Sequence, residues 1–320
     1  MTSMSHGEAR WVRLALFALW PLALILAIAL EAPARAQSDP SAPPAAPQAG
    51  GYVGEKECAS CHEAEARGYQ EGPHARAWDP RTPAAARACE SCHGPGAAHV
   101  EDPGAAGRIT NFLKIAPREV SEQCMTCHNR EEHAQWLGSM HDSRNITCVN
   151  CHSTHSPKSE SGLLKTATVV QTCAQCHRDK AAKLLRSNHM PVREGKLDCA
   201  TCHNQHGSTN ARMLRVGNTV NETCVSCHTE KRGPFLWEHP PVRENCTTCH
   251  DPHGSSNDRM LVAKAPMLCQ RCHIATRHPS TIYDAVQVAN SSNRIVGRAC
   301  VNCHSNIHGS NHPSGIRFQR

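Results

Sequence analysis

The residues in this chain with the most evident chemistry are its twenty cysteines, all of which lie in ten copies of the pattern Cys-x-x-Cys-His. Two thiols at this spacing add to the vinyl groups of a haem, and the histidine that follows binds its iron. The pattern therefore predicts ten covalently bound haem c groups (iron) and a chain that moves electrons. The attachment cysteines are Cys58, Cys61, Cys89, Cys92, Cys124, Cys127, Cys148, Cys151, Cys173, Cys176, Cys199, Cys202, Cys224, Cys227, Cys246, Cys249, Cys269, Cys272, Cys300 and Cys303. The proximal histidines are His62, His93, His128, His152, His177, His203, His228, His250, His273 and His304.

Three other uses of Cys-x-x-Cys compete with haem attachment. Such a pair supplies half of a zinc site, a redox-active dithiol or part of a disulfide framework. None of these needs a histidine directly after the second cysteine in all ten copies. The recurring histidine, together with the absence of any leftover cysteine, favours haem.

A second set of ten histidines lies at regular places between the motifs. After each even-numbered motif a histidine follows closely, and after each odd-numbered motif a histidine follows later. Ten such residues for ten irons predict bis-histidine ligation, which closes both faces of the iron and suits electron transfer rather than substrate binding. The distal candidates are His99, His155, His206, His253 and His308 after even motifs, and His74, His141, His189, His239 and His278 after odd motifs.

Some alternatives to these axial ligands stay open. His133 is an alternative to His141, and His312 is an alternative to His308. Four methionines are also candidate ligands, although packing on haem faces is the favoured interpretation of them. They are Met140, Met190, Met213 and Met260.

The spacing of three distal candidates restricts which haem they serve. His155, His206 and His253 each follow a proximal histidine by three residues. A histidine so close cannot wrap around its own porphyrin to the opposite face, so each must reach a different haem. This cross-ligation would hold haems close together, but the sequence does not decide which histidine serves which neighbour.

The spacing of the motifs predicts how the haem-binding part is organised. Motifs begin 22 to 35 residues apart and alternate in character, so residues 52–320 are expected to form one decahaem domain of five haem dyads. Only 4% of residues are aromatic, so the porphyrin faces must supply the core. The expected fold is a multihaem cytochrome, mostly loops and short α-helices around a linear chain of ten haems, with almost no β-sheet. A compact ball is the alternative.

The first 36 residues are expected to be a signal peptide. Arg10 and Arg13 precede an apolar run from Leu14 to Leu30, and small residues suited to cleavage precede Gln37. A retained membrane anchor is the alternative, because a run of seventeen residues reaches the lower limit for a span. Cleavage is the favoured interpretation, followed by a Pro/Ala-rich linker over 37–51 and a location in the periplasm.

The net charge changes sign once the cofactors are counted. The chain carries +6 at pH 7, but ten haems bring about twenty propionate groups, which outweigh this charge. A basic surface for nucleic acid is therefore not implied, and no nucleic-acid partner is expected.

The chain resembles the periplasmic decahaem cytochromes of the MtrA, PioA and DmsE family. The resemblance covers about 52–320 and rests on ten motifs in a short chain, the Cys-His-x-x-His-Gly pattern, and the segment from Cys89 to His99. It implies insertion into an outer-membrane β-barrel porin, with the first haem facing the periplasm and the tenth facing the exterior. It also implies electron exchange with periplasmic or inner-membrane cytochromes, and with an extracellular multihaem cytochrome as a further partner. The alternation into five dyads does not fit the duplicated five-haem unit described for that family.

Three functions fit the sequence to different degrees. The favoured one is a wire between periplasm and cell exterior, with no catalytic residues, serving metal or mineral reduction or iron oxidation. A multihaem reductase needs an iron with an open face or a lysine in the motif, and no Cys-x-x-Cys-Lys occurs. A soluble periplasmic electron shuttle is the third. The direction of electron flow is not readable from residue identity.

Overall fold

The computed structural model describes residues 51–273 and 299–319. The chain divides into two units, Met1–Gln48 and Ala49–Arg320, and all of the described residues belong to the second. The expected signal peptide, almost all of the expected linker and His278 lie outside the described residues. The proposed domain boundaries therefore stay predictions.

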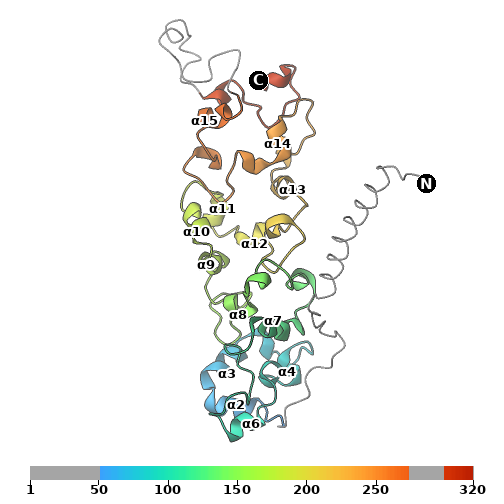
Figure 1. Cartoon of the computed structure of the whole chain (residues 1–320), viewed down its shortest axis with the longest axis vertical. Coiled ribbons are helices and arrows are strands. Elements are labelled where there is room, and N and C mark those ends of the chain that lie inside the picture. Colours follow the sequence, from blue (N-terminus) through green and yellow to red (C-terminus); the bar gives the residue numbers. More distant parts are fainter. Residues whose placement is uncertain (1–50, 274–298, 320) are drawn as a thin grey trace, which may run out of the picture. The chain divides into compact units, whose positions relative to one another are not determined.

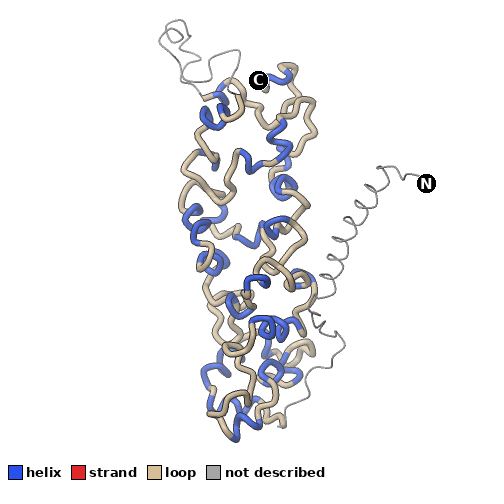
Figure 2. Tube along the Cα trace, in the orientation of Figure 1, coloured by secondary structure: helices blue, strands red, loops and turns tan. Residues whose placement is uncertain are grey.

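Short helices joined by loops make up the second unit, and its described residues contain no β-strand (Figures 1 and 2). Five isolated β-bridges occur among these residues in place of a sheet. The expected fold class of short helices and loops is thereby confirmed. The α-helices are α2 Glu55–Cys61, α3 Glu63–Gln70, α4 Pro83–Ala86, α5 Glu90–His93, α6 Ala97–Glu101, α7 Pro117–Met125, α8 Cys148–Cys151, α9 Val169–Ala174, α10 Arg178–Leu184, α11 Met190–Arg193, α12 Cys199–Cys202, α13 Val220–Val225, α14 Pro240–Glu244 and α15 Ala265–Gln270. The 3₁₀-helices are η1 Pro73–Ala75, η2 Glu131–His133, η3 Asp142–Arg144, η4 Ala211–Met213, η5 Thr229–Lys231, η6 Cys246–Thr248, η7 Asp258–Met260, η8 Cys300–Asn302 and η9 Gly315–Arg317.

None of the helices in the described ranges combines the length and the apolar character needed to cross a membrane.

The two kinds of motif have two kinds of local structure. Odd-numbered motifs lie at the end of a helix that starts upstream, namely α2, α7, α9, α13 and α15. Thr168 and Thr219 begin two of these helices by accepting a hydrogen bond from the backbone N–H three residues on. Even-numbered motifs instead open a single turn at or next to the first cysteine, as α12 does after its cap Asp198. The two kinds of motif that alternate in the sequence therefore differ in structure: odd motifs end a helix, and even motifs begin one.

Apolar side chains form almost no core in the described residues. Only six hydrophobic residues there are buried, whereas Leu113 is 90% exposed and Leu185 is 79% exposed. Side chains this exposed gain little from folding on their own, because hydrophobic stabilisation scales with the apolar area removed from water. This sparse burial fits the expectation that porphyrin faces supply the core. The buried hydrophobic residues are Tyr69, Ala88, Val120, Trp136, Leu214 and Phe318.

Loops from neighbouring dyads cross at glycines that follow a distal candidate histidine. A Cβ atom at these glycines would lie 2.1 Å from the Gln135 carbonyl oxygen, 2.4 Å from that of Lys183 and 2.2 Å from the Phe235 ring. Side chains have no room at such approaches, so the Gly in Cys-His-x-x-His-Gly is a packing requirement. The three glycines, with φ of 116°, 120° and 136°, are Gly207, Gly254 and Gly309.

The first crossing of this kind reverses the arrangement. Here the glycine is on the earlier loop, since a Cβ atom on Gly68 would lie 1.4 Å from the carbonyl oxygen of His155. Ser156 follows His155 in place of a glycine. One of the two crossing backbones must lack a side chain, and either can be the one.

Replacement of Gly254 by alanine should destabilise the holoprotein, because the new Cβ atom would overlap the Lys183 carbonyl and strain a positive φ. We expect a loss of about 2–4 kcal/mol in the free energy of unfolding, measured by thermal unfolding of the holoprotein. Gly195→Ala is the matched control, since φ there is 71° but nothing lies within 4 Å of the added atom. Equal losses in both variants would show that backbone strain alone, and not the crossing, determines the effect.

A buried carboxylate holds the first dyad together. Glu90, only 4% exposed, accepts backbone N–H bonds from Val53 at 3.0 Å, Gly54 at 3.0 Å and Gly96 at 2.8 Å. Burial by itself would raise the pKa of this carboxyl, but the three N–H bonds outweigh it and lower the pKa below its usual value. Glu90 thus joins the start of α2 to the loop that follows the second motif.

Glu90→Gln should free the segment around Val53 and Gly54. Hydrogen bonds to a charged group are worth about 1.5–3 kcal/mol, so amide exchange there should be at least about tenfold faster in the variant. Because the folded pKa is lowered, the wild-type advantage should be complete above about pH 4.3 and decline as pH falls through the folded pKa. Hydrogen–deuterium exchange at several pH values measures this, with exposed Glu57→Gln as the control. Equal exchange in the two variants would contradict it.

Candidate haem-binding sites

All ten attachment motifs form one helical turn. In each, the backbone N–H of the histidine donates to the carbonyl of the first cysteine, at 2.9 to 3.1 Å. Residues i, i+3 and i+4 of such a turn share one face. Both thiols and the imidazole are thereby presented together, as attachment to one porphyrin requires.

Nine of the proximal histidines face a distal candidate across a gap suited to an iron atom. A metal–imidazole bond is about 2 Å long and the ring centre lies about 1 Å beyond, so two rings on one iron have centres about 6 Å apart. The nine ring pairs have centroid separations of 6.0 to 6.4 Å. They are His62–His99, His74–His128, His93–His155, His141–His177, His152–His206, His189–His228, His203–His253, His239–His273 and His250–His308.

The pairs follow a two-motif rule. A distal histidine after an odd motif faces the proximal histidine two motifs ahead. For example, His141, which follows the third motif, faces His177 of the fifth motif. A distal histidine after an even motif faces the proximal histidine two motifs back. For example, His206, which follows the sixth motif, faces His152 of the fourth motif. His99, which has no motif two places behind it, faces the first motif instead. These distances support the predicted ligation, which stays a prediction.

Three candidate histidines remain outside the nine pairs, namely His278, His133 and His312. His278, the distal candidate absent from the nine pairs, lies outside the described residues. His133 packs against His128 and His206, with ring centres 5.5 and 4.2 Å away, both shorter than the iron-spanning distance. The competing His141 faces the proximal His177 at 6.2 Å. His312 accepts a hydrogen bond from its own turn at Ser314, while His308 faces the eighth motif.

The cysteines of successive motifs approach one another in an unbroken order. Within a dyad the first cysteines interact: a hydrogen bond shared with Cys124 lowers the pKa of the free Cys148 thiol. Between dyads the second cysteines are neighbours, and the charge of Cys176 adds to burial in raising the pKa of Cys151. The other pairs are Cys58–Cys89, Cys173–Cys199, Cys224–Cys246 and Cys269–Cys300 within dyads, and Cys92–Cys127, Cys202–Cys227 and Cys249–Cys272 between them.

Backbone carbonyls orient the proximal histidines of the even motifs. Each of the five imidazoles uses Nδ1 in a hydrogen bond of 2.6 to 3.0 Å to a carbonyl, which leaves Nε2 for a metal. Three of the acceptors, Gly162, Arg212 and Arg259, have positive φ, and the two arginines each begin an Arg-Met-Leu segment. The five bonds are His93–Thr110, His152–Gly162, His203–Arg212, His250–Arg259 and His304–Arg317.

Burial lowers the pKa of six distal imidazoles and so favours the neutral form, which is the form that binds metal; they are His74, His155, His206, His239, His253 and His308. Burial lowers the pKa of His206 to about 4, with smaller contributions from His133 and His152. The Nδ1 of His206 and the Nε1 of nearby Trp136 are buried without a hydrogen-bond partner. The Trp136 N–H is always a donor, and the His206 Nδ1–H is a donor when the other ring nitrogen binds a metal. A haem propionate would therefore fit as an acceptor for both groups.

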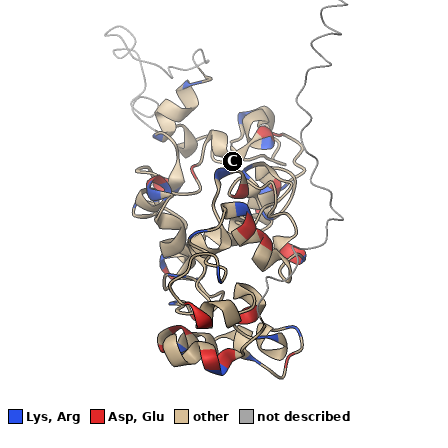
Figure 3. Ribbon diagram, turned by 60° about the horizontal axis from the view of Figure 1, so that its bottom comes forward, with Lys and Arg blue, Asp and Glu red and all other residues tan. Residues whose placement is uncertain are grey.

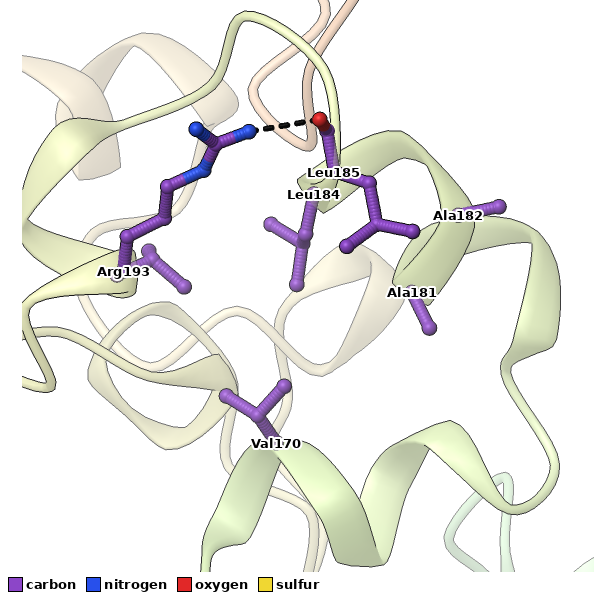
Figure 4. Close-up of a pocket in the computed structure, with 7 residues that line it drawn as sticks. Val170, Ala181, Ala182, Leu184, Leu185 and Arg193 are labelled. Atoms are coloured by element: carbon purple, nitrogen blue, oxygen red, sulfur yellow. Dashed lines mark hydrogen bonds between the residues drawn. The ribbon is translucent and has the colours of Figure 1, made fainter.

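A cavity of about 510 Å³ lies between α9, α10 and α11 (Figure 4). Its size and mainly apolar lining fit a porphyrin face next to the fifth motif. Arg193 donates to the Leu185 carbonyl at 2.7 Å at its edge. The lining residues are Val170, Ala181, Ala182, Leu184, Leu185, Val192 and Arg193. A bound haem here would supply one-electron chemistry, while these side chains would exclude water from its face.

Comparison with known proteins gives related results. The family model of the doubled CXXCH motif matches residues 141–182, 189–233 and 239–278, and each range begins at a distal candidate histidine. The multihaem cytochrome MtrA of Shewanella baltica (strain OS185) is 40% identical over 276 residues, covering 83% of this chain and 81% of that protein. An undecahaem cytochrome from the S-layer of Carboxydothermus ferrireducens is 20% identical over 72% of this chain, which spans only 32% of its length. With a TM-score of 0.11, that structure carries no argument about the fold.

Replacement of His206 by alanine should leave the fourth haem high-spin without loss of attachment, because His206 faces only the proximal His152 at the iron-spanning distance. Electron paramagnetic resonance detects one new high-spin signal, and intact-mass measurement counts haems. His133→Ala is the control and should keep every iron low-spin. The signal should vanish when Cys148 and Cys151 are also replaced by alanine, and its persistence would show that His206 serves a different haem.

Proposed function

Because the chain belongs to the MtrA family of multihaem c-type cytochromes, which are electron-transfer proteins, we propose that it binds ten haems and conducts electrons between the periplasm and the cell exterior. In this proposal it is inserted in an outer-membrane β-barrel porin. Its twenty cysteines and ten proximal histidines would hold the haems, and the ten distal candidates would complete each iron.

The observation that carries the proposal is the set of nine facing histidine pairs. A haem iron with an imidazole on each side has no position left for a substrate, so it exchanges electrons through its edge and not by binding a reactant. Pairs at 6.0 to 6.4 Å support this closed arrangement at nine motifs. A carrier, and not an enzyme, is the role that such sites suit.

The order of the cysteine contacts supports conduction along the chain. The cysteines of consecutive motifs interact in pairs, first with first or second with second, so neighbouring haems would be consecutive from the first motif to the tenth. Haems arranged this way offer one continuous path with two ends. A wire needs such a path, whereas a reductase needs one open iron.

The surroundings of the first motif support an electron-transfer partner at that end. The helices α2 and α3 expose Glu57, Glu63 and Glu65 beside the first motif, and acidic residues are visible on these helices in Figure 3. Opposite charge steers the approach of electron-transfer partners, so a periplasmic or inner-membrane cytochrome with a basic face fits here. The tenth haem would face the exterior, where an extracellular multihaem cytochrome is the expected partner. No nucleic-acid partner is proposed.

Purification from outer membranes tests the barrel. The tagged holoprotein, taken from detergent-solubilised outer membranes of its own cells, should bring a β-barrel protein with it. The complex in liposomes should then pass electrons from external dithionite to an enclosed dye. Cys173→Ala/Cys176→Ala, which removes a haem from the middle, should stop transfer while the barrel still binds, and His133→Ala should change neither. Recovery of the holoprotein without a barrel would favour a soluble shuttle.

Carbon monoxide binding tests the carrier role. We expect none by the dithionite-reduced holoprotein, read from the Soret band, because both faces of each iron are closed. Binding at one haem per molecule would contradict the carrier role and favour a reductase.

A further inference from the structure

In the sixth and eighth motifs, the residue directly after the proximal histidine caps the turn that leads to the distal histidine. In the sixth motif the side-chain oxygen of Asn204 accepts the backbone N–H of His206 at 3.1 Å. In the eighth motif Asp251 accepts that of His253 at 3.0 Å. The two loops are otherwise alike, so comparing them shows the effect of a carboxylate in place of an amide at this position.

The carboxylate of Asp251 also lies beside a distal imidazole. Its Oδ1 is 3.4 Å from Nδ1 of His253, and its Oδ2 is 2.5 Å from Nζ of Lys183 in α10. The Asp251 side chain is 20% exposed and that of His253 is 35% exposed, so solvent screens this contact only in part. The carboxylate accepts hydrogen bonds from the Lys183 ammonium group and from the backbone N–H of His253, which fix its place beside the imidazole.

A carboxylate also lies near another imidazole of the nine pairs. Glu230 lies 3.8 Å from Nδ1 of His228, and both side chains are more than half exposed. The longer distance and the free access of water make that contact the weaker of the two. It provides a natural comparison for Asp251.

We propose that Asp251 is a positioning residue that lowers the reduction potential of the sixth haem, the one held between His203 and His253. The two imidazoles are 6.2 Å apart, and the carboxylate lies on the Nδ1 side of His253, away from the iron-binding Nε2. A carboxylate at this nitrogen makes the ligand more basic and stabilises ferric over ferrous iron. The inference rests on the proposed function, since it requires a haem between this pair.

The ion pair with Lys183 limits the size of the effect. The ammonium group offsets part of the negative charge that would otherwise act on the iron, and Lys183 lies on α10, in the loop after the fifth motif. The reduction potential of the sixth haem would therefore depend on an ion pair between neighbouring dyads. The two partners act in opposite directions on the same iron.

Potentiometric titration of the holoprotein, followed by visible and electron paramagnetic resonance spectra, tests the proposal. Asp251→Asn keeps an acceptor for the His253 backbone, as Asn204 does in the sixth motif, and should raise one component of the titration. A tenfold change in the preference for ferric iron is expected, about 59 mV for one electron. Glu230→Gln removes the same charge at the weaker contact and should shift its component by less.

Lys183→Met provides the test of opposite sign and leaves Asp251 in place. It should lower the same component that Asp251→Asn raises, which a purely structural role of the ion pair would not produce. An unchanged titration in both variants, with ten haems by mass and low-spin spectra, would overturn the proposal. If Asp251→Asn fails to hold its haems, a rise or no change in Lys183→Met overturns it as well. Neither result affects whether a barrel co-purifies, so the two proposals fail separately.

Discussion

The structure depends on one constraint: each distal imidazole must face a proximal imidazole from another part of the chain at the distance that one iron spans. Nine pairs meet it at 6.0 to 6.4 Å. Since His155, His206 and His253 cannot serve their own haems, their loops must extend to another motif, and each faces the motif two places back. With only six buried hydrophobic side chains in the described residues, these connections take the place of a conventional core.

The local features of the chain follow from that constraint. Helices are short because each motif needs only one turn to present two thiols and an imidazole, and the next loop must then leave for another haem. Loops that extend in opposite directions have to cross, and the crossings are so close that one backbone must be glycine, as at Gly207 and Gly68. The glycine in Cys-His-x-x-His-Gly is therefore required by the crossing of loops and not by haem attachment.

A repeated scaffold still gives its haems different surroundings. Carbonyl groups orient the proximal imidazoles of the even motifs, among them His203 and His250, whereas the distal His253 lies beside the carboxylate of Asp251. Burial lowers the pKa of His206 to about 4, and His133 packs against its ring. Charge and hydrogen bonding are the terms by which a protein sets haem potentials, so identical attachment chemistry need not mean identical potentials along the path.

The attachment cysteines, the proximal histidines and the number of distal candidates could be predicted from the sequence, because these predictions depend on residues within one helical turn or on a simple count. Which distal histidine faces which motif could be read only from the folded chain. His99 and His155 both follow even motifs, yet the first faces His62 of the preceding motif and the second faces His93 two motifs back. The folded chain also placed His141 opposite a proximal imidazole and left His133 between two others. Local spacing specifies what one turn can bind, whereas the face that a loop reaches depends on the path of the whole chain.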